Sequence, residues 1–276
     1  MNLTYLDIAT SNQIPDLELY KDPSETPLRR LYEPEPGVFV AESALVIERA
    51  VDAGYKPMSV LVDEAVLENC MSLLSRPEYD GCPIYVLPKS QIGSIVGYNI
   101  TRGILSLMRR KDNTSAADLL EHLGDKKSRI VVLEEVTNPT NVGAIFRSAA
   151  ALYIDAVLLT SGCADPLYRR TLRVAMGNVF TMPWAYCDKD YIDLLHDKGY
   201  KCASLALNDK SISIEDPLLK NEKRLAMLMG SEGYGLDKTT IEASDYVVKI
   251  PMAEGVDSLN VAAASALAFW EVTRER

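Results

Sequence analysis

The sequence has little of several residue types on which common enzyme classes depend. Among its 276 residues only two are histidine, His122 and His196, and they lie far apart in the chain. No two of its five cysteines form a Cys-x-x-Cys pair; they are Cys70, Cys82, Cys163, Cys187 and Cys202. These shortages disfavour a zinc site of histidine and cysteine, a histidine-based catalytic triad and a disulfide framework. We therefore expect reduced, mostly buried thiols and no bound metal.

Long apolar segments are also lacking. No stretch approaches the roughly 20 apolar residues that cross a bilayer, and Met1 to Asp16 has no basic region followed by an apolar core. Hydrophobic residues make up 47% and charged residues 25%, which is typical of a soluble globular protein. The sequence thus predicts a cytoplasmic protein without membrane contact, and its length predicts one or two domains.

Positive charge is scarce, since the formal net charge is −10. This balance argues against non-specific binding to nucleic acid. The acidic residues are concentrated in residues 1–125, which hold 11 Lys and Arg against 19 Asp and Glu. Residues 126–276 hold 18 against 20. A local basic patch is therefore possible in the second half, whereas the first half allows only a narrow contact with phosphates.

The first part of the chain predicts a small α/β domain after an extended lead-in. Residues 1–36 are rich in Pro, Asp and Glu, with turn signals at 14–16, 22–24 and 33–36. Strands then alternate with helices, which favours an α/β arrangement. We expect strands at 38–40, 59–62, 83–87 and 104–108, and helices at 43–53, 65–75 and 90–96. A polar segment at 111–128, with a short helix at 116–123, predicts a linker.

The second part predicts a mostly parallel sheet. Continuous apolar strands separated by crossover helices are typical of a sheet covered on both faces. The strands are expected at 129–134, 156–160, 201–207, 225–229 and 246–250, with one more after 177–182, and the helices at 142–153, 167–176, 191–198 and 258–274. The predicted class is α/β, with boundaries at 1–110, 111–128 and 129–276.

Three strand ends carry polar or glycine-rich segments, and open parallel sheets bind ligands at the carboxyl ends of their strands. One segment is 137–147, where Asn141 is suited to cap a helix. Another is 230–236, Gly-Ser-Glu-Gly-Tyr-Gly-Leu, whose spacing matches neither a dinucleotide fingerprint nor a P-loop, so a nucleotide-binding oxidoreductase is disfavoured. The last is Ile-Pro-Met at 250–252 with Asp-Ser-Leu-Asn at 257–260. Each segment alone is compatible with an ordinary capped helix or tight turn; together they predict one crevice.

In this order the segments resemble the motifs of the SpoU/TrmH-type RNA 2′-O-methyltransferases, which belong to the SPOUT class of trefoil-knotted enzymes. The motifs are Asn-x-x-Asn-x-Gly-x-x-x-Arg at 138–147, Arg-Val-Ala-Met-Gly at 173–177, the glycine segment at 230–236, and Ile-Pro-Met with Ser-Leu-Asn. The resemblance covers roughly 129–274. Residues 39–105 are similar to the family's N-terminal substrate-binding domain.

The resemblance implies a fold, a cofactor and partners. It implies an open parallel sheet with a deep C-terminal trefoil knot, beside a smaller N-terminal α/β domain that binds RNA. It further implies S-adenosylmethionine as the cofactor and a homodimer with the site near the subunit interface. The implied reaction is methyl transfer to a ribose 2′-hydroxyl, with ribosomal RNA as the first choice of substrate and tRNA as the second. A non-catalytic RNA-binding dimer is the alternative from another class.

The resemblance also assigns residues by motif position. The catalytic or site-shaping residues are Asn141, Arg147, Glu232, Ser258 and Asn260. The cofactor-binding residues are Gly230, Ile250, Met252 and Leu259, joined by Thr160, Leu205, Ala206 and Leu207 at other strand ends. The RNA contacts are Arg169, Arg170 and Arg173, and weaker candidates are Arg109, Arg110, Lys111, Lys126, Lys127 and Arg129.

Methyl transfer to a ribose hydroxyl depends more on the positioning of the two reacting groups than on a strong base. A ribose hydroxyl must be aligned with the methyl group and its developing charge stabilised. The family's usual proposal makes Arg147 the base. An arginine pKa of about 12.5–13.8 makes neutral guanidine very rare at neutral pH. We therefore expect Arg147 to hold a phosphate and stabilise the alkoxide, while a phosphate oxygen takes the proton.

Overall fold

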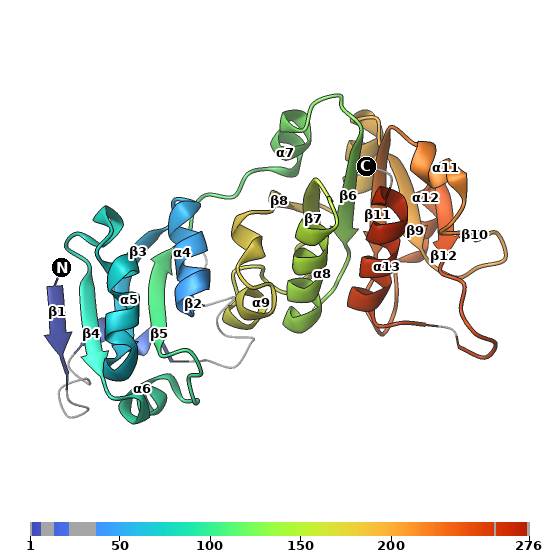
Figure 1. The fold of residues 1–276 in the computed structure, drawn as a ribbon. Helices are drawn as coiled ribbons and strands as arrows, with labels where there is room; N and C mark the ends of the chain where they lie inside the picture. Colours follow the sequence, from blue (N-terminus) through green and yellow to red (C-terminus); the bar gives the residue numbers. More distant parts are fainter. Residues whose placement is uncertain (1, 7–13, 22–36, 257, 275–276) are drawn as a thin grey trace. The chain divides into compact units, whose positions relative to one another are not determined.

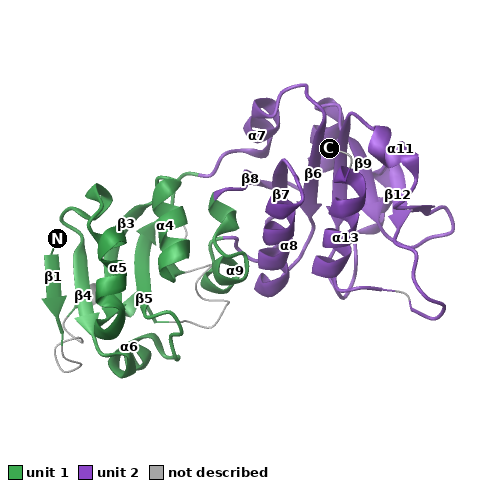
Figure 2. Ribbon diagram, in the orientation of Figure 1, with its two compact units in different colours: residues 1–112, 167–180 green, residues 113–166, 181–276 purple. Residues whose placement is uncertain are grey.

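The computed structural model describes residues 2–6, 14–21, 37–256 and 258–274. The chain divides into two compact units (Figure 2). Unit 1 comprises Met1–Asp112 and Leu167–Phe180, and unit 2 comprises Asn113–Pro166 and Thr181–Arg276. The segment 167–180 belongs to unit 1 although the residues on both sides of it belong to unit 2, and the amino-acid composition does not indicate this. The turn signals at 22–24 and 33–36 lie outside the described residues.

Unit 1 is built on a mixed five-stranded sheet in the order β1-β4-β3-β5-β2 (Figure 1). The strands are β1 (Asn2–Tyr5), β2 (Val38–Glu42), β3 (Lys56–Asp63), β4 (Pro83–Leu87) and β5 (Ile104–Arg109). β1, β4 and β3 run parallel, and β5 is antiparallel to both β3 and β2. The helices of unit 1 are α2 (Pro15–Glu18), α4 (Ala44–Asp52), η1 (Glu64–Val66), α5 (Leu67–Leu74), η2 (Pro77–Tyr79), α6 (Lys89–Val96), α9 (Arg169–Val174) and η3 (Asn178–Phe180). Unit 1 therefore has the α/β character that the sequence predicts.

The prediction of an extended lead-in was wrong for two described pieces. Residues 2–5 form β1, an edge strand that pairs in parallel with β4, and Pro15–Glu18 forms the helix α2. A four-residue strand and a one-turn helix are too short to show a hydrophobic period in sequence. β1, whose side chains are mostly exposed, depends on backbone pairing with the distant strand β4. The chain after α2 is held by Tyr20, which is fully buried and bonds the hydroxyl of Ser59 at 2.9 Å.

The segment 167–180 is held in unit 1 by polar and aromatic contacts. Arg49 Nη1 donates to the carbonyl of Met176 at 2.8 Å and to Asn178 Oδ1 at 2.5 Å. The Phe180 ring lies 5.1 Å from that of Tyr55. Gly177, the glycine of the motif at 173–177, has φ +76°, and an added Cβ would lie 3.4 Å from Val46 Cα and 3.1 Å from Arg49 Cδ. This motif glycine therefore serves close packing against α4.

Unit 2 contains a seven-stranded sheet in the order β10-β12-β9-β11-β6-β7-β8. All its strand pairs are parallel. The strands are β6 (Ser128–Leu133), β7 (Ala156–Thr160), β8 (Trp184–Cys187), β9 (Lys201–Leu205), β10 (Ile212–Ser213), β11 (Arg224–Met229) and β12 (Tyr246–Lys249). The helices are α7 (Ala116–His122), α8 (Pro139–Ala151), α10 (Tyr191–Asp197), α11 (Pro217–Asn221), α12 (Lys238–Ala243) and α13 (Val261–Thr273). The predicted parallel sheet is confirmed.

Helices cover both faces of this sheet. Alternate residues of β6, β7 and β11 pack with α7, α10 and the start of α12 in one apolar core, as period-two side-chain alternation requires. On the other face α8 packs against α13 (Figure 1). α8 follows the end of β6, and α12 follows the end of β11. No helix among the described residues is long and apolar enough to cross a membrane.

Helix boundaries differ from prediction where a different residue acts as the cap. α8 begins at Pro139, because the side chain of Asn138 accepts from the Thr140 amide at 2.9 Å; Asn141 does not cap it. α13 begins at Val261 and not at Ser258, because Asn260 is its cap. The sequence reading also missed β10, α11 and α12, which have two to six residues each.

Candidate functional site

Three segments that are remote in sequence meet at the carboxyl edge of the unit 2 sheet. The loop 231–236, called the glycine loop below, follows β11 and is closed by hydrogen bonds between the backbones of Ser231 and Gly235 at 3.0 and 3.1 Å. It lies between the end of β6 with the start of α8 and the end of β12 with the start of α13. Pockets lie on both of its sides and share the loop as a wall.

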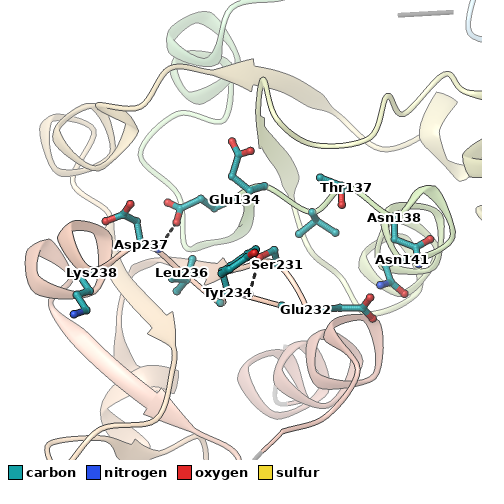
Figure 3. Close-up of a pocket in the computed structure, with 14 residues that line it drawn as sticks. Glu134, Thr137, Asn138, Asn141, Ser231, Glu232, Tyr234, Leu236, Asp237 and Lys238 are labelled. Atoms are coloured by element: carbon teal, nitrogen blue, oxygen red, sulfur yellow. Dashed lines mark hydrogen bonds between the residues drawn. The ribbon is translucent and has the colours of Figure 1, made fainter. Parts of the chain in front are cut away.

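The first pocket, called the acidic pocket below, has a volume of about 800 Å³ (Figure 3). Its lining contains four carboxylates and a single ammonium group, those of Glu134, Glu135, Glu232, Asp237 and Lys238. The remaining lining residues are Val136, Thr137, Asn138, Asn141, Ser231, Gly233, Tyr234, Gly235 and Leu236. The pocket therefore presents mainly hydrogen-bond acceptors and a negative potential.

The second pocket, called the apolar pocket below, has a volume of about 460 Å³. Ends of three neighbouring strands and the start of α13 line it. The lining residues outside the glycine loop are Leu205, Ala206, Leu207, Met229, Gly230, Ile241, Val248, Lys249, Ile250, Met252, Ser258, Leu259, Val261 and Ala264. Seven of the eight residues that the sequence assigns to the cofactor thus line one pocket; they are Leu205, Ala206, Leu207, Gly230, Ile250, Met252 and Leu259.

Thr160 is the eighth, and the structure places it elsewhere. It ends β7, is buried, and lines neither the acidic nor the apolar pocket. Its hydroxyl donates to Glu135 Oε1 at 3.2 Å and accepts from the Glu135 amide at 3.1 Å. These bonds hold Glu135 at φ +55°. Thr160 therefore shapes the loop after β6.

Gly230 is required by the loop itself. A Cβ at this position would lie 2.2 Å from the carbonyl carbon of Gly235 and 2.3 Å from the Leu236 amide nitrogen. Both are backbone atoms that cannot move aside without opening the loop. Any larger residue at Gly230 would therefore distort the wall between the two pockets.

Asn260 joins the three motifs through its side chain. Its Oδ1 accepts from the amides of Ala262 and Ala263, at 3.0 and 3.3 Å, as the cap of α13. Its Nδ2 donates to Glu232 Oε1 at 2.5 Å and to Asn141 Oδ1 at 3.2 Å. Because the cap fixes the orientation of the Asn260 amide, it also fixes those of Glu232 and Asn141.

Asn141 binds Asn260 through its Oδ1 only, so its Nδ2 donor is not used by Asn260. The residue is only 5% exposed, and its Nδ2 has no hydrogen-bond partner among the described residues. Its side chain lines the acidic pocket between Asn138 and Glu232 (Figure 3). A buried amide without a partner costs free energy of about 1–3 kcal/mol. Asn141 Nδ2 is therefore poised to donate to a bound molecule.

The other two assigned residues stand apart from this trio. Arg147 is exposed on α8 and makes no hydrogen bond or ion pair with any other described residue. It lines neither of the two pockets. Ser258 is exposed and lines the apolar pocket. The structure thus brings Asn141, Glu232 and Asn260 together, and leaves Arg147 free to contact a ligand from solvent.

Glu134 is a residue that the sequence reading missed as a determinant of the site. It is 8% exposed and accepts three hydrogen bonds of 2.7 Å, from the Tyr191 hydroxyl, the Thr240 hydroxyl and the Asp237 amide. Burial and the adjacent carboxylate raise the pKa of Tyr191, so that it stays a donor. Glu134 thereby ties the end of β6 to the start of α12. The sequence could have indicated this role, because Glu134 directly follows an apolar strand, where polar residues of a parallel sheet often form the site.

The arginines assigned to RNA lie in unit 1. Arg170 and Arg173 are exposed. Arg169 is half-buried; its Nη2 donates to the Tyr20 carbonyl at 2.9 Å and its guanidinium lies 4.9 Å from the centre of the Tyr98 ring. Those contacts give Arg169 a packing role within unit 1.

Arg129, a weaker RNA candidate in the sequence, is corrected by the structure. Its side chain is completely buried. It donates to the carbonyls of Ser128 at 3.0 Å and Lys220 at 2.8 Å, and also to those of Lys223 and Val272 at 3.4 Å. Arg129 therefore binds backbone and not RNA, because strand β6 carries it beneath α11 and α13.

Comparison with known proteins agrees with the motif order. Residues 128–270 match the model of the SpoU rRNA Methylase family. A protein of Mycobacterium bovis, named as an uncharacterized tRNA/rRNA methyltransferase, is 32% identical over 263 residues, or 94% of this chain and 89% of the relative. The Bacillus subtilis 23S rRNA (guanosine(2553)-2′-O)-methyltransferase RlmP is 27% identical over 191 residues, 67% of this chain and 76% of RlmP.

Solved structures share the fold. An AdoMet-bound rRNA methyltransferase from Sinorhizobium meliloti superimposes with a TM-score of 0.80 at 21% identity, covering 99% of this chain and 98% of that one. The SpoU methyltransferase AviRb from Streptomyces viridochromogenes, in complex with AdoMet, gives 0.74 at 18% identity, covering 94% and 96%. With the family model matching more than half of the chain and a relative above 30% identity along most of it, this chain belongs to the SpoU rRNA Methylase family of RNA methyltransferases.

Proposed function

We propose that this protein transfers a methyl group from S-adenosylmethionine to a ribose 2′-hydroxyl of ribosomal RNA. One observation carries the proposal: three family motifs, remote in sequence, converge on the glycine loop, with an apolar pocket on one side and an acidic pocket on the other. The named activities of the relatives and the AdoMet bound by two structural neighbours support it.

The apolar pocket fits the cofactor. Its volume of about 460 Å³ lies within the range of roughly 300–1,000 Å³ that small-molecule sites show. Its wall of leucine, isoleucine and methionine side chains suits the adenine ring, and the strand-end backbone and Ser258 supply polar groups. We assign Leu205, Leu207, Ile250, Met252 and Leu259 to this contact, with Ala206 and Gly230 allowing close approach. When bound, S-adenosylmethionine supplies an electrophilic methyl group.

The chain's own residues position and activate the ribose. Arg147, free on α8, holds a phosphate of the substrate and stabilises the oxygen as its charge develops, while a phosphate oxygen accepts the proton. Asn141, oriented by Asn260, donates to a ribose or phosphate oxygen. Positioning of this kind supplies much of the acceleration of a group transfer.

We further propose that RNA contacts Arg170 and Arg173, which are exposed on α9. The acidic composition of the chain limits the number of phosphates engaged, so that affinity for RNA falls only moderately with salt. We also propose that the protein works as a homodimer with a trefoil-knotted unit 2, as the motifs imply. The exposed Leu267 and Trp270 on α13 offer an apolar surface for the second copy.

Calorimetric titration with S-adenosylmethionine tests the cofactor site. Ala264→Leu places a larger side chain in the apolar pocket, whereas Ala117→Leu makes the same change at an exposed position of α7, outside both pockets. We expect micromolar binding to the wild type and to Ala117→Leu, and a loss of about tenfold or more in Ala264→Leu, because overpacking a formed cavity costs about 1–3 kcal/mol. Equal binding by both variants would contradict the assignment.

Replacement of Arg147 separates an enzyme from an RNA-binding protein. With transcribed ribosomal RNA and pooled tRNA as substrates, Arg147→Ala should lose methyl transfer by about 100-fold or more, by analogy with removal of one oxyanion donor, while RNA binding persists. Unchanged transfer would remove Arg147 from the mechanism. RNA binding with no transfer by the wild type would favour the non-catalytic dimer, and transfer to tRNA alone would replace ribosomal RNA as the substrate.

A further inference from the structure

The C-terminal end of α9 is closed by a turn that is unusual for its residue types. The amide of Gly177 donates to the Leu172 carbonyl at 3.0 Å, and the amide of Met176 donates to the Arg173 carbonyl at 3.2 Å. This pair of hydrogen bonds is a Schellman motif, in which the residue after the C-cap adopts the left-handed conformation. Here that residue is Met176, with φ +55°, where glycine is usual.

Arg49 holds this turn from α4, which belongs to the same unit (Figure 2). Its Nη1 donates to the Met176 carbonyl at 2.8 Å and to Asn178 Oδ1 at 2.5 Å, and these residues are 127 and 129 positions further along the chain. A left-handed residue with a side chain costs free energy and persists where the surrounding structure imposes it. Arg49 supplies such contacts on both sides of Gly177.

The helix α9 is too short to set its own direction. Its six residues are fewer than the roughly 12–15 that an isolated helix needs to be stable in water. Its first residue is held, because Arg169 donates to the Tyr20 carbonyl and lies over the Tyr98 ring. Its last residues depend on the turn that Arg49 holds. The direction of α9 therefore depends on one arginine contact at each end.

These contacts determine where the exposed arginines of α9 lie. Arg170 and Arg173 are three positions apart, so their side chains start from the same side of the helix, about 5–6 Å apart. The guanidinium of Arg173 makes no hydrogen bond or ion pair with other described residues. Its carbonyl accepts from the Met176 amide, so a shift of the turn moves Arg173 directly.

We propose that Arg49 is a positioning residue for RNA binding, which holds the end of α9 so that Arg173 binds a phosphate of the substrate. The proposal rests on the proposed function, because it requires that RNA contacts α9. The Nη1 of Arg49 is occupied by Met176 and Asn178. Its contribution therefore passes through Arg173, whose planar guanidinium binds a phosphate by two parallel hydrogen bonds.

A double-mutant cycle on RNA affinity tests this role in the full-length protein. Filter binding to transcribed ribosomal RNA and to pooled tRNA is measured for the wild type, Arg49→Met, Arg173→Met and the double variant. We expect each single variant to bind about tenfold more weakly, as the loss of one charge-assisted contact predicts. The double variant should bind no more weakly than Arg173→Met, whereas independent effects would multiply to about 100-fold.

The salt dependence of binding distinguishes a lost phosphate contact from a loss of folded protein. The slope of log affinity against log salt concentration should fall by about one in Arg49→Met, as in Arg173→Met. A smaller fraction of folded protein would lower the apparent affinity without changing this slope. Circular dichroism reports folding, and calorimetric titration with S-adenosylmethionine shows that the apolar pocket of unit 2 is intact.

Two further variants serve as controls. Arg49→Lys keeps a donor for one of the two acceptors and should recover part of the lost affinity. Arg76→Met removes another half-buried arginine of unit 1, which pairs with Asp52 and Glu78, and should leave RNA affinity unchanged. If Arg49→Met does not fold, the same cycle is measured with Arg49→Lys.

The outcomes separate the positioning role from the proposed function. Losses that multiply in the double variant, or an unchanged affinity or salt slope in Arg49→Met, overturn the positioning role, while methyl transfer by the wild type leaves the proposed function intact. RNA binding that depends on Arg49 and Arg173 without methyl transfer by the wild type keeps the positioning role and removes the proposed reaction. A wild type that binds no RNA overturns both.

Discussion

At the scale of single residues, Arg129 shows how the fold accommodates a buried charge. Arg129 is completely buried, yet its guanidinium is surrounded by backbone carbonyls from β6, from the end of α11 and from α13. The carbonyls of Lys220 and Val272 lie in the last turns of α11 and α13, where the helix itself provides no donors. Arg129 therefore satisfies two acceptors at helix ends, and joins three elements of unit 2.

Replacement of this arginine should be strongly destabilising. Arg129→Met keeps much of the volume but removes the donors to the Lys220 and Val272 carbonyls, and we expect the free energy of unfolding to fall by about 3 kcal/mol. Urea denaturation followed by circular dichroism measures the change. The control is Arg274→Met, which removes an exposed arginine with one ion pair to Glu271 and should cost less than about 1 kcal/mol. Similar losses in both variants would show that the buried contacts contribute little.

At the scale of elements, several joints of unit 2 are made by one carboxylate between two or three chain segments. Asp245 precedes β12, accepts from the Cys202 amide on β9 at 2.9 Å, and pairs with His196 on α10 at 3.0 Å and Lys201 at 2.6 Å. His196, Cys202 and Asp245 also form the one cluster of potential metal ligands among the described residues. The Lys201 ammonium already pairs with the Asp245 carboxylate, so we assign this cluster a packing role.

The Asp245 joint predicts a pH-dependent stability. Burial acts to raise the pKa of Asp245, but hydrogen bonds from Lys201, the Cys202 amide and His196 outweigh it, and the pKa is lowered. A lowered folded-state pKa means that the stabilisation is present above the unfolded value of about 3.9 and is lost as the pH falls through the folded value. Asp245→Asn should therefore destabilise by about 1–3 kcal/mol at pH 7 and by much less near pH 2.

Thermal denaturation across this pH range measures the difference. Asp125→Asn is the matched control, because Asp125 pairs with Lys223 on the exposed surface and its pKa is also lowered. That variant should show little change at either pH. A loss in Asp245→Asn that is the same at pH 2 as at pH 7 would mean that the joint depends on shape and not on charge.

At the scale of the whole molecule, the apolar surface of α13 is the feature that a monomer does not explain. Leu267 is 50% exposed and Trp270 is 56% exposed, while the opposite side of the helix is buried against unit 2. Exposed apolar residues that gather on one helix commonly mark an interface. This is the surface that we assign to the second copy in the proposed homodimer.

A single lysine tests that assembly. Leu267→Lys should convert the dimer to a monomer in sedimentation velocity, because a buried unpaired ammonium costs several kcal/mol at an interface. Leu218→Lys is the control, since Leu218 is a leucine of similar exposure, 54%, on α11. A wild-type monomer, or a dimer that survives Leu267→Lys, would move the interface elsewhere or remove it.

The sequence by itself determined the α/β class, the parallel sheet of unit 2 and the motif order that identifies the family. These depend on patterns read within a few residues, such as apolar strands, crossover helices and glycine spacing. Tertiary structure decided which asparagine caps α8, and so left Asn141 buried with a free donor. It also placed Arg129 beneath two helices, joined residues 167–180 to unit 1 and formed the acidic pocket. Burial and pairing depend on residues distant in the chain, and no local pattern encodes them.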